Sequence, residues 1–130
     1  MIRVVDASAL VDALLPAERQ EAALAALAGH ELWAPAILDL EVASALWRLV
    51  RSAEIRDAEA QRAIGYLESA PIRRLQPHDL VAEVWQLRDA LRISDAFYVA
   101  AARRLGADLL TSDARLSRAP KLGVTVVLLR

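Results

Sequence analysis

The first residues of the chain constrain its fold more than any other stretch. Ile2, Val4 and Val5 make a β-branched run that fits a covered strand, and the run ends at a carboxylate, Asp6. From Leu10 onward the apolar spacing is helical. In a parallel sheet, ligands bind outside the carboxyl ends of the strands, where Asp6 would stand. A lone Asp in that position is more often a turn residue or a helix cap.

Strand-like and helical patterns alternate through the rest of the chain. The expected helices are residues 7–15, 18–28, 36–51, 57–69, 78–91, 95–105 and 112–117, and the expected strands are residues 2–6, 31–34, 72–75, 108–111 and 124–129. Such alternation indicates a parallel sheet with right-handed crossovers. We therefore expect one three-layer α/β/α domain over residues 1–130, with a mostly parallel sheet of about five strands and the first strand at its centre.

Composition removes several classes of function. The chain has 130 residues and no Cys, which excludes disulfides and thiolate metal sites and fits a cytoplasmic protein. The sequence shows no apolar run of transmembrane length, so we expect no membrane association. A net charge of −1 provides no global basic field for nucleic acid, although fifteen of the sixteen basic residues are Arg.

The end of the fourth expected strand repeats the opening pattern. An apolar strand reaches Thr111 and Ser112, and Asp113 follows at the start of a short helix. Ser112 or Asp113 could simply cap that helix. If the two strands are neighbours, however, Asp6 and Asp113 meet at one edge of the sheet. Like charges at close range are costly unless a cation lies between them.

Two further carboxylates have unusual settings. Asp95 follows the good N-cap residue Ser94 and suits a helix start, yet it heads an apolar stripe through Tyr98 that should face inward. Glu41 shares a helical stripe with Arg48 and Arg51, which is either a solvated face or the rim of a cleft. Asp12, near Ser8 by helical spacing, is expected to be a solvated helix residue.

Taken together, the four acids suggest a site for a hard divalent cation. Mg²⁺ binds a few carboxylates, keeps several waters and leaves other positions to substrate phosphate. Such an ion lowers the pKa of bound water and stabilises charge on a phosphate. The acids are Asp6, Glu41, Asp95 and Asp113, and the candidate supporting or water-placing hydroxyls are Ser8, Thr111 and Ser112. Candidate phosphate contacts are Arg48, Arg51 and Arg115.

Four ordered segments carry a resemblance to a known family. They are VVDASAL (residues 4–10), PAILDLEVASAL (35–46), DAFYVAAARRLGA (95–107) and LTSD (110–113). Each is weak alone, but in this order and at these separations they resemble the PIN domain, and most of all the VapC-type toxins of bacterial and archaeal toxin–antitoxin pairs. The resemblance extends over about residues 2–128.

The resemblance implies a Mg²⁺- or Mn²⁺-dependent endoribonuclease whose acidic quartet falls on Asp6, Glu41, Asp95 and Asp113. Its metal ligands would be the three aspartates. It also implies a structured RNA substrate such as tRNA or rRNA, a VapB-type antitoxin partner and a homodimer. Many members of the family carry a further acid shortly after the fourth, whereas Arg115 stands there in this chain. This difference favours one firmly bound ion, with a second recruited by substrate.

Two other functions fit parts of the pattern. A receiver-type phosphoacceptor domain also combines a parallel sheet with strand-end Asp and Mg²⁺, but it needs paired acids after the first strand and a Lys at the end of a late strand. Here the acid is single and the only lysine, Lys121, lies between a helix and a strand. A non-catalytic PIN-like interaction module would keep the fold without needing the full acidic quartet.

Overall fold

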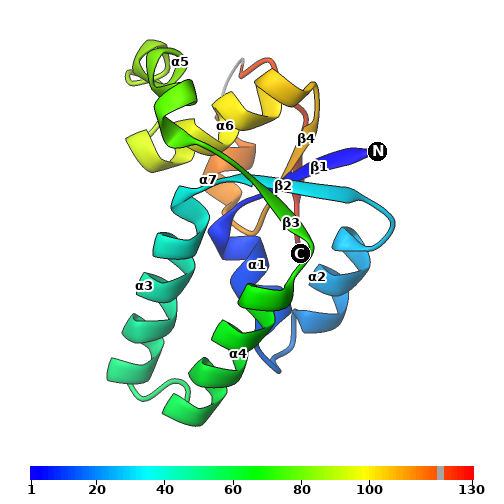
Figure 1. The fold of residues 1–130 in the computed structure, drawn as a ribbon, viewed down its shortest axis with the longest axis vertical. Coiled ribbons are helices and arrows are strands. Elements are labelled where there is room, and N and C mark those ends of the chain that lie inside the picture. Colours follow the sequence, from blue (N-terminus) through cyan, green and yellow to red (C-terminus); the bar gives the residue numbers. More distant parts are fainter. Residues whose placement is uncertain (120–121) are drawn as a thin grey trace.

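Five short strands form one fully parallel sheet in the computed structural model, which describes residues 1–119 and 122–130 (Figure 1). The strands are β1 (Ile2–Val5), β2 (Glu31–Pro35), β3 (Ile72–Leu75), β4 (Asp108–Thr111) and β5 (Val126–Leu128). Their order is β3-β2-β1-β4-β5. The order reverses between β1 and β4, and such a switch point is where open parallel sheets bind ligands.

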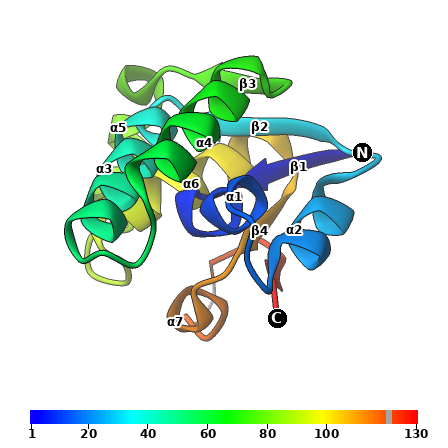
Figure 2. The same ribbon diagram turned by 90° about the horizontal axis from the view of Figure 1, so that it is seen from below.

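Helices cover both faces of the sheet (Figure 2). They are α1 (Ala7–Leu14), α2 (Gln20–Leu27), α3 (Ile37–Arg51), α4 (Asp57–Ser69), the 3₁₀ helix η1 (Pro77–Leu80), α5 (Val81–Gln86), α6 (Ile93–Leu105) and α7 (Ala114–Ser117). Helix α1 packs against α2, α3 and α4, while α6 lies on β1, β2 and β4 and contacts α5. The predicted three-layer α/β/α architecture is confirmed, as is the central position of β1.

The centre of the sheet explains why the opening residues are so apolar. Val4 and Val5 are fully buried, and so are Leu109 and Leu110 on the neighbouring strand β4. Val5 is in register with Leu110, and the backbone N–H of Asp6 donates to the Leu110 carbonyl at 3.0 Å. This pairing sets the end of β1 directly beside the end of β4, as the site prediction required.

Three element predictions are wrong in detail. The helix expected over residues 78–91 is η1 followed by the short α5, because backbone N–H groups after Gln86 bond three residues back and tighten the chain into turns. Helix α6 begins two residues early, and its N-cap is Arg92 rather than Ser94. Strand β5 is short and only half-covered, because it lies at the sheet edge.

Lys121, expected between a helix and a strand, falls outside the described residues. Across residues 1–119 and 122–130, no helix is long and apolar enough to cross a membrane.

Candidate active site

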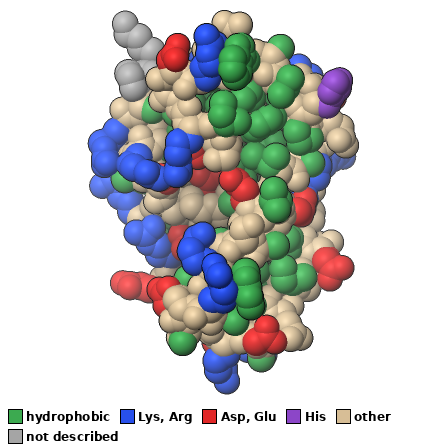
Figure 3. All heavy atoms as spheres, turned by 90° about the vertical axis from the view of Figure 1, so that its left-hand side faces the viewer, with side chains coloured by type: hydrophobic (Ala, Val, Ile, Leu, Met, Phe, Trp, Pro, Cys, Tyr) green, Lys and Arg blue, Asp and Glu red, His purple; other side chains and the backbone are tan. Residues whose placement is uncertain are grey.

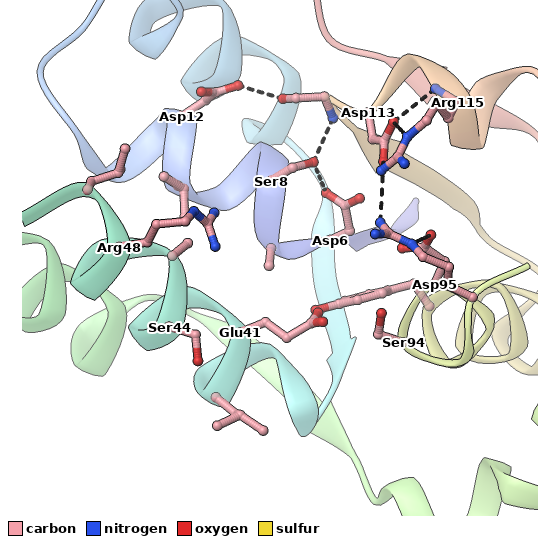
Figure 4. Close-up of a pocket in the computed structure, with 18 of the residues that line it drawn as sticks. Asp6, Ser8, Asp12, Glu41, Ser44, Arg48, Ser94, Asp95, Asp113 and Arg115 are labelled. Atoms are coloured by element: carbon pink, nitrogen blue, oxygen red, sulfur yellow. Dashed lines mark hydrogen bonds and ion pairs between the residues drawn. The ribbon is translucent and has the colours of Figure 1, made fainter. Parts of the chain in front are cut away.

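A cleft of about 780 Å³ opens beside the carboxyl ends of β1 and β4, between α1, α3 and the start of α6 (Figure 4). Eight of the predicted site residues line it: Asp6, Ser8, Glu41, Arg48, Asp95, Ser112, Asp113 and Arg115. They come from four separate stretches of the chain. The topology therefore brings all four predicted carboxylates to one cavity.

Asp6 is the most firmly held of the four. It is the N-cap of α1, and its Oδ1 accepts from the Ala9 N–H at 3.0 Å and from the Ser8 hydroxyl at 2.7 Å. Its Oδ2 accepts from the hydroxyl of Thr111, at the end of β4. A carboxylate offers about four acceptor positions, so Oδ2 keeps one position for a further partner.

Burial makes the charge on Asp6 costly. The side chain is only 5% exposed, and desolvation raises the pKa of its carboxyl from 3.8 to about 6. The hydrogen bonds from Thr111, Ala9 and Ser8 oppose this shift, and the nearby Asp95 charge adds to it. A buried carboxylate close to a second one is typical of a site that is built to receive a cation.

Glu41 is held from across the cleft by a tyrosine. The Tyr98 hydroxyl donates to Glu41 Oε1 at 2.6 Å. Burial first, and then this bond, raises the pKa of the Tyr98 phenol well above its usual range, so the phenol stays a donor. Glu41 and Ser44 lie on one stripe of α3 with Arg48, and all three line the cleft. The rim interpretation of this stripe therefore holds for Glu41 and Arg48 but not for Arg51, which does not line the cleft.

Asp95 and Asp113 are both engaged by arginines. Arg92 Nε donates to Asp95 Oδ2 at 3.3 Å, and Arg92 Nη2 lies 3.8 Å from Asp113 Oδ2. Arg115 binds Asp113 with both Nε, at 3.2 Å, and Nη2, at 3.0 Å. The hydrogen bond with Arg115 holds the pKa of Asp113 below its usual value.

The supporting hydroxyls form a continuous network. Ser8 Oγ accepts from the Ser112 N–H at 3.0 Å while it donates to Asp6, and Thr111 Oγ1 accepts from the Asp113 N–H at 3.0 Å. Thr111 is fully buried and does not line the cleft. The expectation that Thr111 could place an attacking water is therefore wrong, because its hydroxyl is committed to Asp6 and Asp113.

The sequence interpretation missed several cleft residues. Asp12, expected to be solvated, lines the cleft and accepts from the Ser112 hydroxyl at 2.5 Å, with Arg19 Nη1 3.7 Å away. Its spacing of four residues from Ser8 was the available signal. Arg92 was missed because it precedes the expected helix start. Arg51 does not line the cleft; its guanidinium lies 5.6 Å from the Trp47 ring centroid.

The donor set suits a hard divalent ion, since carboxylate oxygens are its preferred ligands. Among the described residues, however, no three acidic or His side chains are already placed to hold one ion together. Two guanidinium groups stand against Asp95 and Asp113 instead. The residues fit a divalent ion provided that these arginines move away from Asp95 and Asp113. Asp6 already has an acceptor position open for the ion.

Charge and shape around the cleft are uneven. Figure 3 shows carboxylates within a hollow, basic side chains to its left and below it, and hydrophobic side chains to its right. Four arginines line the cleft: Arg19, Arg48, Arg92 and Arg115. Carboxylates at the base of the cleft could bind a metal ion, and the arginines around them could bind the phosphates of a nucleic-acid backbone.

Comparison with known proteins gives this geometry a family context. Residues 3–122 match the family model described as PIN domain. The chain is 44% identical over 117 residues to Ribonuclease VapC3 of Mycobacterium tuberculosis. The aligned region covers 89% of this chain and 85% of that protein.

Two solved structures share the fold. A toxin–antitoxin complex from Klebsiella pneumoniae contains a chain with a TM-score of 0.70 at 17% identity, covering 98% of both chains. VapC20 of M. tuberculosis, described as a toxin that cleaves the sarcin–ricin loop, has a TM-score of 0.65 at 19% identity, covering 88% of this chain and 92% of that one.

Proposed function

The chain belongs to the PIN domain family, and from this premise we propose that it is a VapC-type toxin: an endoribonuclease that depends on a divalent metal ion, Mg²⁺ or Mn²⁺. One observation carries the proposal. Four carboxylates separated by up to 107 positions in sequence line a single cleft at the switch point of the sheet: Asp6, Glu41, Asp95 and Asp113. A fold alone does not imply an activity, whereas the residues gathered in this cleft support a specific one.

The aspartates Asp6, Asp95 and Asp113 would hold the ion. When bound, it would supply charge stabilisation at the scissile phosphate and a lowered pKa for an attacking water. Glu41, kept in place by Tyr98, is the candidate to accept the proton of that water. Thr111 and Ser8 hold the Asp6 carboxylate in its orientation, and Asp12 holds the Ser112 hydroxyl.

Arginines at the rim would bind the RNA. Arg48 and Arg115 line opposite sides of the cleft, on α3 and α7, and can contact phosphates on either side of the scissile bond. Arg51, one turn beyond Arg48, would contact a more distant phosphate. The proposed substrate class is structured RNA such as tRNA or rRNA, in line with the sarcin–ricin loop named for VapC20.

Protein partners complete the proposal. The solved relatives include toxin–antitoxin complexes, which supports a VapB-type antitoxin as partner. Exposed hydrophobic side chains also support a homodimer, because an interface would remove their apolar surface from water. They are Leu40, Val81, Trp85 and Ile93. Light scattering of the purified chain at several concentrations would measure its oligomeric state.

The test of the activity is cleavage of defined RNAs by the purified chain with Mg²⁺, with Mn²⁺ and with EDTA. Wild type is compared with Asp95→Asn and with Asp79→Asn, a matched change at a carboxylate outside the cleft. We expect cleavage by wild type and Asp79→Asn, and a loss of at least 100-fold in Asp95→Asn, as for other charge-stabilising groups in active sites. Absence of cleavage with either metal would instead favour a non-catalytic interaction module.

A further inference from the structure

Three of the four cleft arginines already have carboxylate partners: Arg19 Nη1 lies 3.7 Å from Asp12, and the other two arginines face predicted metal ligands. Arg92 lies between Asp95 and Asp113, and Arg115 binds Asp113 through two nitrogens. Arg48 differs from them, because within the described residues it forms no ion pair or side-chain hydrogen bond. The basic rim therefore contains one arginine free to bind phosphate and others that are committed.

Two guanidinium groups surround the Asp113 carboxylate. Its Oδ1 accepts from the backbone N–H and from Nε of Arg115, and its Oδ2 accepts from Arg115 Nη2 and faces Arg92 Nη2. The three hydrogen bonds leave one of the roughly four acceptor positions of the carboxylate, on Oδ2, and the Arg92 guanidinium faces that oxygen at 3.8 Å. An ion can therefore bind Asp113 only if Arg92 moves away from Oδ2 or a hydrogen bond from Arg115 is lost.

The exchange is energetically accessible. The side chains of Arg92 and Arg115 are 63% and 66% exposed, and ion pairs this open to water contribute little stability. Once displaced, each guanidinium remains tethered at the cleft wall, where an RNA phosphate would lie. Arginine binds phosphate with the same planar fork that it uses for a carboxylate.

We propose that the divalent ion and RNA bind this cleft with positive coupling. When Asp95 and Asp113 bind the ion, they release Arg92 and Arg115, and these arginines then bind RNA phosphates. This inference rests on the proposed function. By linkage, RNA must raise the affinity for the ion by the same factor as the ion raises the affinity for RNA. The two arginines thus switch partners rather than serve as permanent parts of the RNA site.

The coupling can be measured without catalysis. A labelled RNA hairpin is titrated with the protein over a range of KCl concentrations, with EDTA and then with Ca²⁺ at a fixed concentration. Each arginine newly placed on a phosphate steepens the plot of log K against log salt by about 0.7 to 0.9. We expect the wild-type slope to be steeper with Ca²⁺ by roughly 1.4 to 1.8.

A matched pair of variants separates this mechanism from simple attraction between the ion and RNA. In Arg92→Gln/Arg115→Gln, the slope should no longer steepen when Ca²⁺ is added. Arg48→Gln removes a cleft arginine without a carboxylate partner, so its slope should be shallower by roughly 0.7 to 0.9 under both conditions. A double variant that still steepens as wild type does would overturn the proposal.

Metal affinity alone provides a second measurement. Calorimetric titration with Mn²⁺ in the absence of RNA should show tighter binding to Arg92→Gln/Arg115→Gln, by up to about tenfold, because the competing cations are gone. Arg48→Gln should bind Mn²⁺ as wild type does, and unchanged binding to the double variant would contradict the exchange. If wild type binds neither Mn²⁺ nor RNA, the proposed function itself fails; if it binds both without coupling, only this inference fails.

Discussion

Asp6→Asn should stabilise the fold at neutral and alkaline pH while it abolishes activity. The pKa of Asp6 is raised from 3.8 to about 6, mainly by burial, so the folded chain holds this proton more tightly than the unfolded chain. Stability from Asp6 is thus fully present below pH 4 and is lost as pH rises through 6. At about 1.4 kcal/mol for each unit of pKa, the loss is on the order of 3 kcal/mol.

Asn resembles the protonated acid in shape and charge. It can still accept from the Ala9 N–H, but its amide cannot accept the bond that Thr111 now donates. If that rearrangement costs about 1 kcal/mol, the variant should be about 2 kcal/mol more stable than wild type at pH 8. Below pH 4.5 the advantage should vanish, because wild type is protonated there too.

Urea unfolding in EDTA, followed by far-UV circular dichroism at pH 4.5 and pH 8, measures both differences. Carboxylates with lowered pKa values, such as Asp39 and Asp113, titrate in both proteins and cancel in the comparison. If Asp6→Asn is no more stable than wild type at pH 8, Asp6 does not carry a buried and unfavourable charge. The inference that burial of the Asp6 charge favours binding of a cation would then be refuted.

Three other outcomes follow from the contacts of the site and of the opposite sheet edge. Tyr98→Phe should lower RNA cleavage and destabilise the fold by about 1.5–3 kcal/mol, because it removes a hydrogen bond to the Glu41 carboxylate; gel assays and urea unfolding measure both. Asp108→Asn should destabilise the fold by about 1 kcal/mol with cleavage unchanged, since it weakens only the bidentate Arg3 pair at the other end of the strands. Cleavage should stop in EDTA and return when Mn²⁺ is added, and activity that persists in EDTA would contradict a metal-dependent mechanism.

The architecture was predictable because short local signals agreed with one another. Each local signal fits only one place in a parallel α/β fold. These signals are the β-branched run before Asp6, the helix stop at Gly106 and the apolar strand before Thr111. Their alternation leaves few topologies. Residues 78–91 were harder, because a helical pattern does not reveal where i to i+3 bonding replaces i to i+4 bonding.

The candidate site was only partly accessible from sequence. The strand-end acids Asp6 and Asp113 were predictable because strand ends share an edge of the sheet, whereas Glu41 was predicted mostly from the family resemblance. Partnerships such as Arg92 with Asp113, or Asp12 with Ser112, join residues that are distant in sequence and depend on side-chain direction. A hydrophobic period or a motif does not encode that direction, so these contacts become visible only in the folded structure.

The hydrogen bond between Asp6 and Thr111 has a consequence for when the cleft forms during synthesis of the chain. It joins residues 105 positions apart, and Asp113 lies still further along the chain. A ribosome that has made the first hundred residues has therefore produced β1 without the neighbour that holds its carboxylate, and without the fourth acid. The cleft with its four carboxylates is assembled only when synthesis is nearly complete, so under the proposed function we expect unfinished chains not to cleave RNA.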